Sequence, residues 1–145
     1  ESRGLGDVYK RQIEIRVVKT VGDVNIVGIH NTNGVDIYNL TPHDIVLDNG
    51  IERITFPKND INVRVQEGYV DVENDYGLPF EKEDGNKIVT GLPEEEGKVL
   101  YIVSTMVRKE LLNRKDLISP TTNVAHQERN EKGWTLSVSH FQTNL

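Results

Sequence analysis

The chain has 145 residues and a formal net charge of −6, from 17 basic and 23 acidic side chains. This length suits a single domain, and the acidic balance argues against binding of nucleic-acid polymers by general electrostatics. Cysteine is absent, which excludes disulfides and thiolate zinc sites, and no apolar run approaches the length of a membrane span, so no membrane partner is expected.

The first segment, residues 1–12, ends in DVYKRQ (7–12), and Met106 is the only methionine. Reverse translation of DVYKRQ resembles the end sequence that transposase-based library preparation attaches to DNA. We therefore predict that residues 1–12 are a translated sequencing adapter in a metagenomic sequence, the alternative being a genuine basic arm.

The next segments are expected to be short strands, because they are rich in β-branched residues and bounded by turn residues. Asn33-Gly34 and Asp48-Asn49-Gly50 supply two of these turns, since both residue types tolerate positive φ. Strands are expected at residues 13–18, 24–29, 35–40, 45–47, 53–56 and 61–66.

From Glu67 to Gly97 the apolar pattern loosens. Two Gly-Leu-Pro tripeptides, at 77–79 and 91–93, predict turns, and residues 88–90 predict a short strand between them. The run holds ten acidic residues and two lysines, which favours a solvated or docking surface: Glu67, Asp71, Glu73, Asp75, Glu81, Glu83, Asp84, Glu94, Glu95 and Glu96, with Lys82 and Lys87.

VLYIVS (99–104) predicts a buried central strand, and residues 105–114 predict the only convincing helix, with Val107 and Leu111 at helical spacing. Residues 134–141 alternate and predict a last strand. The expected fold class is α+β, a compact β-rich single domain with one helix after a central strand.

The domain is expected to span residues 36–145. Residues 13–35 are either an additional hairpin or upstream DNA translated in frame.

The first candidate site is NLTPHDIVL (39–47). On a strand, Asn39, Thr41 and His43 share a face and could hold a small ligand by hydrogen bonds. The alternative is a turn that ends the strand, in which these side chains satisfy nearby backbone groups.

The second candidate site is the junction of strand and helix, where free amides and the helix dipole favour an anion. Tyr101 would stack on a base, Ser104 would donate to a phosphate, and Arg108, on the exposed side of the helix, and Arg114 would add charge. Alternatively Tyr101 is a core residue, Ser104 only caps the helix, and Arg114 pairs with Asp116 on the surface.

No catalytic residue, metal site or cofactor is predicted. The four histidines lack metal-ligand spacing, and hydrolase and phosphate-loop motifs are absent from the sequence. An acid–base pair of His43 with Asp44 or Asp116 is the weakest alternative.

Several segments occur together in a recurring order: DIYNLTPHDIVL, then GLPFEKEDGNKIVTGLPEEEGKVLYIVS, RKDLISP, and a late strand ending in HFQ. As a set, they resemble a family of small phage and prophage proteins over residues 36–141. The resemblance implies a phage setting, in the cytoplasm of an infected bacterium, and no catalytic residues. Small acidic phage proteins are often anti-defence factors, and some sequester nucleotide-derived immune signals.

The leading functional expectation is therefore a non-enzymatic phage accessory protein, and more specifically an anti-defence sponge that binds a small anionic, nucleotide-derived ligand without turnover. A homo-oligomer is expected, because paired chains give a small domain a deeper pocket. The alternatives are an interaction or virion-associated protein that uses the acidic stretch Glu67–Glu96, and a small hydrolase of nucleotide signals.

Overall fold

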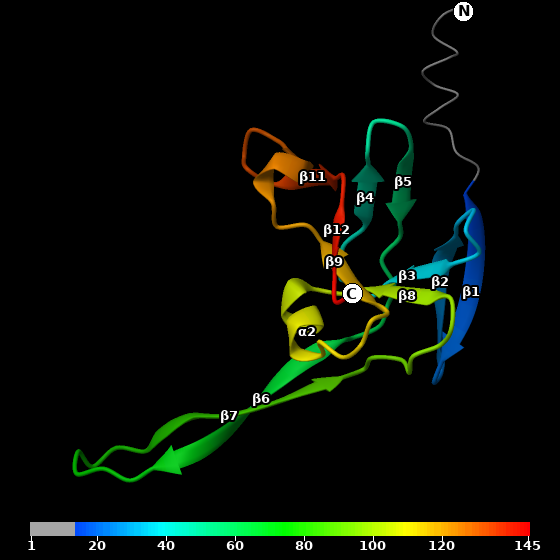
Figure 1. Ribbon diagram of the computed structural model, residues 1–145. Coiled ribbons are helices and arrows are strands. Elements are labelled where there is room, and N and C mark those ends of the chain that lie inside the picture. Colours follow the sequence, from blue (N-terminus) through cyan, green and yellow to red (C-terminus); the bar gives the residue numbers. More distant parts are fainter. Residues whose placement is uncertain (1–13) are drawn as a thin grey trace, which may run out of the picture.

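The computed structural model describes residues 14–145 (Figure 1). The elements are β1 (Ile15–Val21), β2 (Val24–His30), β3 (Asp36–Asn39), β4 (Ile45–Asp48), β5 (Arg53–Phe56), β6 (Arg64–Val72), β7 (Phe80–Thr90), β8 (Val99–Ile102), α2 (Thr105–Glu110), β9 (Leu117–Pro120), the 3₁₀ turn η1 (Val124–His126), β10 (Gln127–Arg129), β11 (Thr135–Val138) and β12 (Phe141–Thr143). The predicted adapter, residues 1–12, lies outside the described residues.

The main sheet has six strands in the order β1-β2-β3-β8-β9-β12. Its centre is parallel, because β8 pairs with β3 on one side and with β9 on the other in the same direction. Strand β8 carries the most apolar run of the chain, and Tyr101 and Ile102 are fully buried. A strand covered on both faces reads as a continuous apolar run, which is why its central place was predictable.

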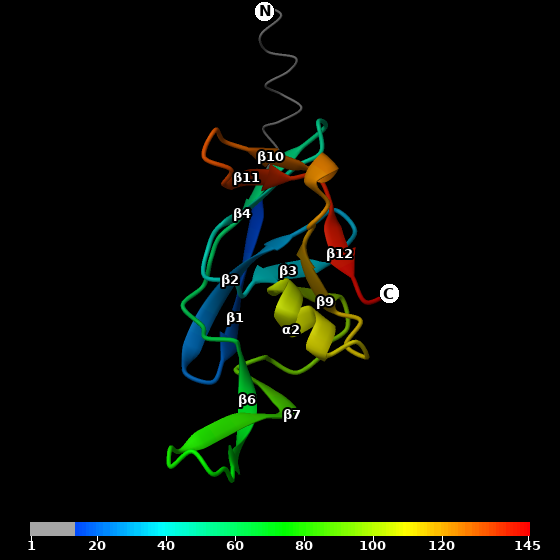
Figure 2. The same ribbon diagram turned by 90° about the vertical axis from the view of Figure 1, so that its left-hand side faces the viewer.

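The two faces of the main sheet pack against different layers. Leu117 and Tyr101 point to the face covered by α2, where Val107 joins their cluster. Ile102 and Ile118 point to the other face and pack with Phe56. That second face is covered by a four-stranded sheet in the order β10-β11-β4-β5 (Figure 2).

The N-terminal hairpin, β1 and β2, belongs to the main sheet. Strand β2 pairs with β3 through Gly28↔Tyr38 and the two following pairs. Ile26 is fully buried and Ile29 is nearly so, one in each apolar cluster. The segment 15–30 therefore contributes to the core on both faces of the sheet.

Strands β6 and β7 form a two-stranded arm that projects away from the rest of the molecule (Figures 1 and 2). The strands expected at residues 61–66 and 88–90 overlap the base of β6 and β7, and Gly77 and Gly91 adopt the positive φ of turns. The outer part of the arm was not predicted, because most of its side chains are solvent-exposed and a bulge between Glu67 and Tyr69 shifts the register. A ribbon with no buried face shows no apolar alternation.

The helix is confirmed but shorter than predicted. It begins after Ser104, whose hydroxyl accepts a hydrogen bond from the Val107 amide at 3.2 Å, as expected of an N-cap. It ends at Glu110 instead of residue 114, and strand β9, which was not predicted, follows at Leu117. One short helix in a β-rich domain makes α+β a loose description, and the projecting arm makes the shape less compact than expected.

Candidate functional site

The segment from Asn39 to His43 forms a closed hydrogen-bonded turn. The Asn39 side chain donates to the backbone carbonyls of His43, at 2.7 Å, and Phe56, at 2.9 Å. Its Oδ1 accepts from the Thr41 amide at 2.9 Å, and the single hydroxyl proton of Thr41 is within reach of two acceptors, Asn39 Oδ1 at 2.7 Å and the His43 carbonyl at 2.9 Å. Asn39 and Thr41 are buried, so this segment has the geometry of the alternative reading, a turn that ends the strand.

Asn59 ties the same turn to the main sheet. Its amide group donates to the carbonyls of Asn39, at 2.9 Å, and Val27, at 3.0 Å, and its Oδ1 accepts from the Val27 amide at 2.7 Å. The motif was recognisable from sequence, but this partner, twenty residues downstream, was not. Because these amides satisfy buried backbone groups, the turn is a structural connection between the two sheets.

His43 differs from its two neighbours because it is exposed. Within the described residues its imidazole has no hydrogen-bond partner. It lines a hollow between β4 and β11, together with Asp44 and Trp134. Of the three residues predicted in this segment, only His43 is therefore placed to meet a ligand.

Tyr101 lies in the core between the main sheet and α2. It is fully buried, and its ring lies 6.0 Å from that of Tyr38 on the adjacent strand. Burial raises the pKa of the Tyr101 phenol, an effect that the nearby Lys19 ammonium opposes. The hydroxyl makes no hydrogen bond to any described residue. Tyr101 on β8 lies opposite Tyr38 on β3, and Asn39 is the next residue of β3. Successive side chains of a strand point to opposite faces, so the side chains of Tyr101 and Asn39 lie on opposite faces of the sheet.

Arg108 is buried, and its placement on the exposed side of the helix was wrong: only 7% of the residue is exposed. Its guanidinium donates to the Ser119 hydroxyl at 2.7 Å and to Asn144 Oδ1 at 3.0 Å. Asn144 in turn donates to the carbonyls of Arg108 and Leu111 at the end of the helix, each of which also accepts a hydrogen bond from a backbone amide. Arg108 thus connects α2 with β9 and the C-terminal strand.

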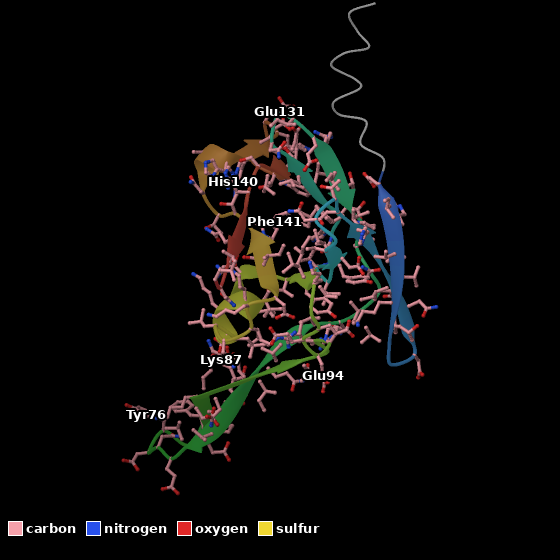
Figure 3. The ribbon with its side chains drawn as sticks, turned by 45° about the vertical axis from the view of Figure 1, so that its right-hand side comes forward. Tyr76, Lys87, Glu94, Glu131, His140 and Phe141 are labelled. Carbon is pink, nitrogen blue, oxygen red and sulfur yellow. The ribbon has the colours of Figure 1, made fainter. Side chains whose placement is uncertain are left out.

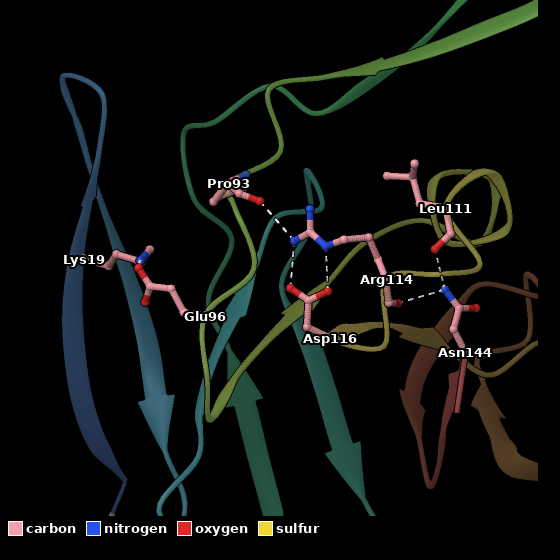
Figure 4. Close-up of polar contacts among 7 residues, drawn as sticks. All are labelled: Lys19, Pro93, Glu96, Leu111, Arg114, Asp116 and Asn144. Carbon is pink, nitrogen blue, oxygen red and sulfur yellow. Dashed lines mark hydrogen bonds and ion pairs between the residues drawn. The ribbon is translucent and has the colours of Figure 1, made fainter.

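Arg114 forms a two-pronged ion pair with Asp116 (Figure 4). Its Nε and one terminal nitrogen lie 2.8 and 2.7 Å from the two carboxylate oxygens, and it also donates to the Pro93 carbonyl at 3.0 Å. The expected pairing is confirmed, but Asp116 is only 5% exposed, so the pair is not on the surface. Its position between the Gly-Leu-Pro turn and β9 gives it a structural role.

An ion pair that the sequence did not suggest joins Lys19 on β1 to Glu96, in the loop before β8 (Figure 4). The hydrogen bond to Glu96 raises the pKa of Lys19. No local spacing connects residues so far apart in the chain, so only the fold could reveal this contact.

The seven predicted ligand residues therefore do not line one hollow. Most of their polar groups are engaged within the protein, and they lie on both faces of the main sheet. Within residues 14–145, no group of three or more His, Asp or Glu side chains is arranged to hold a metal ion. The helix in this part of the chain is too short to cross a membrane.

The arm carries a group of exposed large apolar side chains. Tyr76 is 79% exposed and Leu78 60%, and the ring of Tyr76 lies 6.0 Å from that of Phe80. On the opposite face of the ribbon two carboxylates, Asp71 and Glu81, are direct cross-strand partners. Like charges placed opposite each other destabilise a ribbon, so this face is not optimised for the stability of the free protein.

The base of the arm is fixed to the body. Val65 and Val89, which are cross-strand partners, pack against the core cluster under α2. Lys87 lies 3.8 Å from Glu67 on the partner strand and 3.4 Å from Glu110 at the end of α2. These contacts hold the arm at a defined angle to the body.

Comparison of the chain with protein-family models, with curated proteins and with solved structures found no match.

Proposed function

We propose that this protein is a phage accessory protein that acts by binding another protein through the β6–β7 arm. The phage setting, in the cytoplasm of an infected bacterium, rests on the resemblance of the sequence to small phage and prophage proteins. The observation that supports the binding role is the arm itself, which carries Tyr76, Leu78 and Phe80 into solvent, away from either core cluster.

The chemistry of the arm specifies the partner. A two-stranded ribbon is marginally stable in water, and exposed aromatic side chains stabilise it only when another surface covers them. Such side chains are the usual anchors of protein interfaces. The opposed carboxylates Asp71 and Glu81 would be neutralised by a basic surface. The partner is therefore a protein with an apolar slot bordered by lysine or arginine.

The test compares three forms of the purified protein as bait in a bacterial extract. The first is the full chain. The second replaces residues 68–86 by Asn-Gly, which joins the cross-strand partners Glu67 and Lys87 through a two-residue turn and keeps the base of the arm. The third carries Tyr76→Ser and Phe80→Ser.

The proposal is supported if a captured protein binds the full chain but neither variant. The captured protein should also elute with increasing salt and bind the full chain again after it has been purified. Ile51→Ser is the matched control, because Ile51 is 68% exposed but lies in the β4–β5 turn. Capture that persists with the shortened arm would refute the proposal.

A small anionic, nucleotide-derived ligand is the second candidate. It is favoured by the buried hydroxyl of Tyr101, which has no hydrogen-bond partner among the described residues. A thermal-shift screen against cyclic oligonucleotides, ADP-ribose derivatives and plain nucleotides tests it. A ligand at one hundred times its dissociation constant adds about 2.7 kcal/mol of stability. The absence of any shift would remove this candidate.

A further inference from the structure

Strands β4 and β11 both border a hollow. They run parallel, and their single cross-strand pair is Leu47↔Val138. A hollow of about 530 Å³ is lined by residues of both segments ahead of this pair. Its lining residues are 43–46, which lead into and begin β4, 134–138, which lead into and form β11, and Pro120, Thr121 and Gln127. This volume is typical of a small-molecule site.

Both strands present backbone hydrogen-bonding groups to the hollow. β4 pairs along its length with β5, and β11 pairs with β10, on the sides away from each other. Within the part of the chain that the structure describes, the edges that face the hollow have no ladder partner before the Leu47–Val138 pair. Each such edge offers amide donors and carbonyl acceptors that a ligand can use.

An exposed aromatic side chain lines the hollow. Trp134, the only tryptophan of the chain, is 71% exposed, and Leu136, two residues further along, also lines the hollow and is 49% exposed. Ile45 and Val46 of β4 also line the hollow. A flat ring that stacks on the indole and contacts these aliphatic side chains would bury apolar surface that is now in water.

The charges of the hollow select against phosphate. Among residues 14–145, no lysine or arginine lines it, and the titratable side chains that line it are His43 and Asp44. One carboxylate oxygen of Asp44 accepts a hydrogen bond from the Lys58 amide at 2.9 Å, so the carboxylate is held in place. A fixed carboxylate accepts N–H donors from a ring edge and repels an anionic group.

We propose that this hollow binds a neutral, planar, bicyclic heteroaromatic ring that carries N–H groups, such as the base of a purine nucleoside. The ring stacks on Trp134, and its N–H edge meets Asp44 and the free carbonyls of the strand edges. The site is independent of the arm: Glu131, next to the Trp134 strand, and Tyr76, at the arm tip, lie at opposite ends of the molecule (Figure 3).

The single tryptophan provides a direct assay. Its fluorescence, excited on the long-wavelength side of purine absorption, is followed during titration of the full chain with adenosine, guanosine and guanosine monophosphate. We expect saturable quenching by at least one nucleoside, with a dissociation constant below about 1 mM. The monophosphate should bind several-fold more weakly, because Asp44 repels its charge.

Two variants connect the signal to the hollow. Leu136→Asp puts a charge where the ring would lie and should weaken binding at least about tenfold, as expected when a buried apolar contact is replaced by a charge. Asp44→Asn should reduce the preference for nucleoside over monophosphate. Ile51→Ser, outside the hollow, should leave the titration unchanged. Absence of saturable quenching by both nucleosides, tighter binding of the monophosphate, or unchanged binding by Leu136→Asp would each overturn the proposal.

Discussion

The replacement Arg108→Ala should destabilise the protein strongly, although Arg108 is a charged residue on a short surface helix. The guanidinium is buried and donates to Ser119, to Asn144 and, at 3.4 Å, to the Thr143 carbonyl. No carboxylate pairs with it among residues 14–145. Its positive charge is therefore stabilised by hydrogen bonds alone.

The magnitude follows from the groups that would lose their partner. Ser119 is fully buried and Asn144 is 8% exposed, and each buried polar group left without its hydrogen bond costs about 1–3 kcal/mol. Allowing for relaxation, we expect a loss of about 3 kcal/mol in the free energy of unfolding, or roughly 10 °C in melting temperature for a domain of this size. Urea unfolding followed by circular dichroism measures the first value, and calorimetry the second.

Lys109→Ala is the matched control, because Lys109 is exposed on the same helix and has no hydrogen bond or ion pair within the described residues. Its melting temperature should equal that of the unaltered protein. If Arg108→Ala melts within about 2 °C of Lys109→Ala, the Arg108 hydrogen bonds are not structural and the reasoning fails.

Three further predictions concern the core. Asn39→Ala should lose about 2–3 kcal/mol of stability in urea unfolding, because the buried Phe56 carbonyl loses its side-chain donor and the buried Thr41 amide loses its acceptor, whereas exposed His43→Ala should not change it. Ile26→Ala should lose about 3 kcal/mol; a negligible loss would show that the N-terminal hairpin is dispensable. Burial raises the pKa of Tyr101 above its ordinary value of 10.0, so the unfolded chain releases this proton first and stability declines as pH rises above about 10. Lys19, whose pKa is also raised by its ion pair, adds to that decline. Tyr101→Phe should therefore reduce the loss of stability at high pH only in part. At pH 7 this variant should be almost as stable as the unaltered protein, because the hydroxyl has no hydrogen-bond partner among the described residues.

The sequence predicted elements that bury one clear apolar run or contain a local turn signal. β8 and the N-cap of α2 are examples. Five of the six residues 99–104 are apolar, and Ser104 directly precedes the helix, so both signals lie within a few neighbouring residues. The outer part of the arm and β9 were not predicted, for different reasons. The arm has almost no buried face, and β9 is short and ends at Pro120, a residue that usually interrupts a strand.

Site residues were harder to predict, because their roles depend on partners far along the chain. Asn39 was correctly singled out, but the carbonyl of Phe56 that it satisfies cannot be recognised from the sequence. The place of Arg108 is decided by Asn144, which no periodicity connects to it. Trp134 follows the glycine turn of the β10–β11 hairpin, and the sequence indicated only one of several alternating apolar residues. Its exposure depends on how β11 is placed beside β4, with which it forms a single cross-strand pair, and this placement cannot be derived from the local sequence.

The parallel pairing of β3 with β8 sets the order in which the chain can fold. Asp36 must meet Val99, and closing so long a loop is entropically costly and slow. The hairpins β4–β5 and β6–β7 lie inside that loop and pair locally, so each forms on a microsecond timescale and shortens the length of free chain that remains to be closed. We therefore expect the arm to bring Val65 and Val89 together before the central sheet is complete.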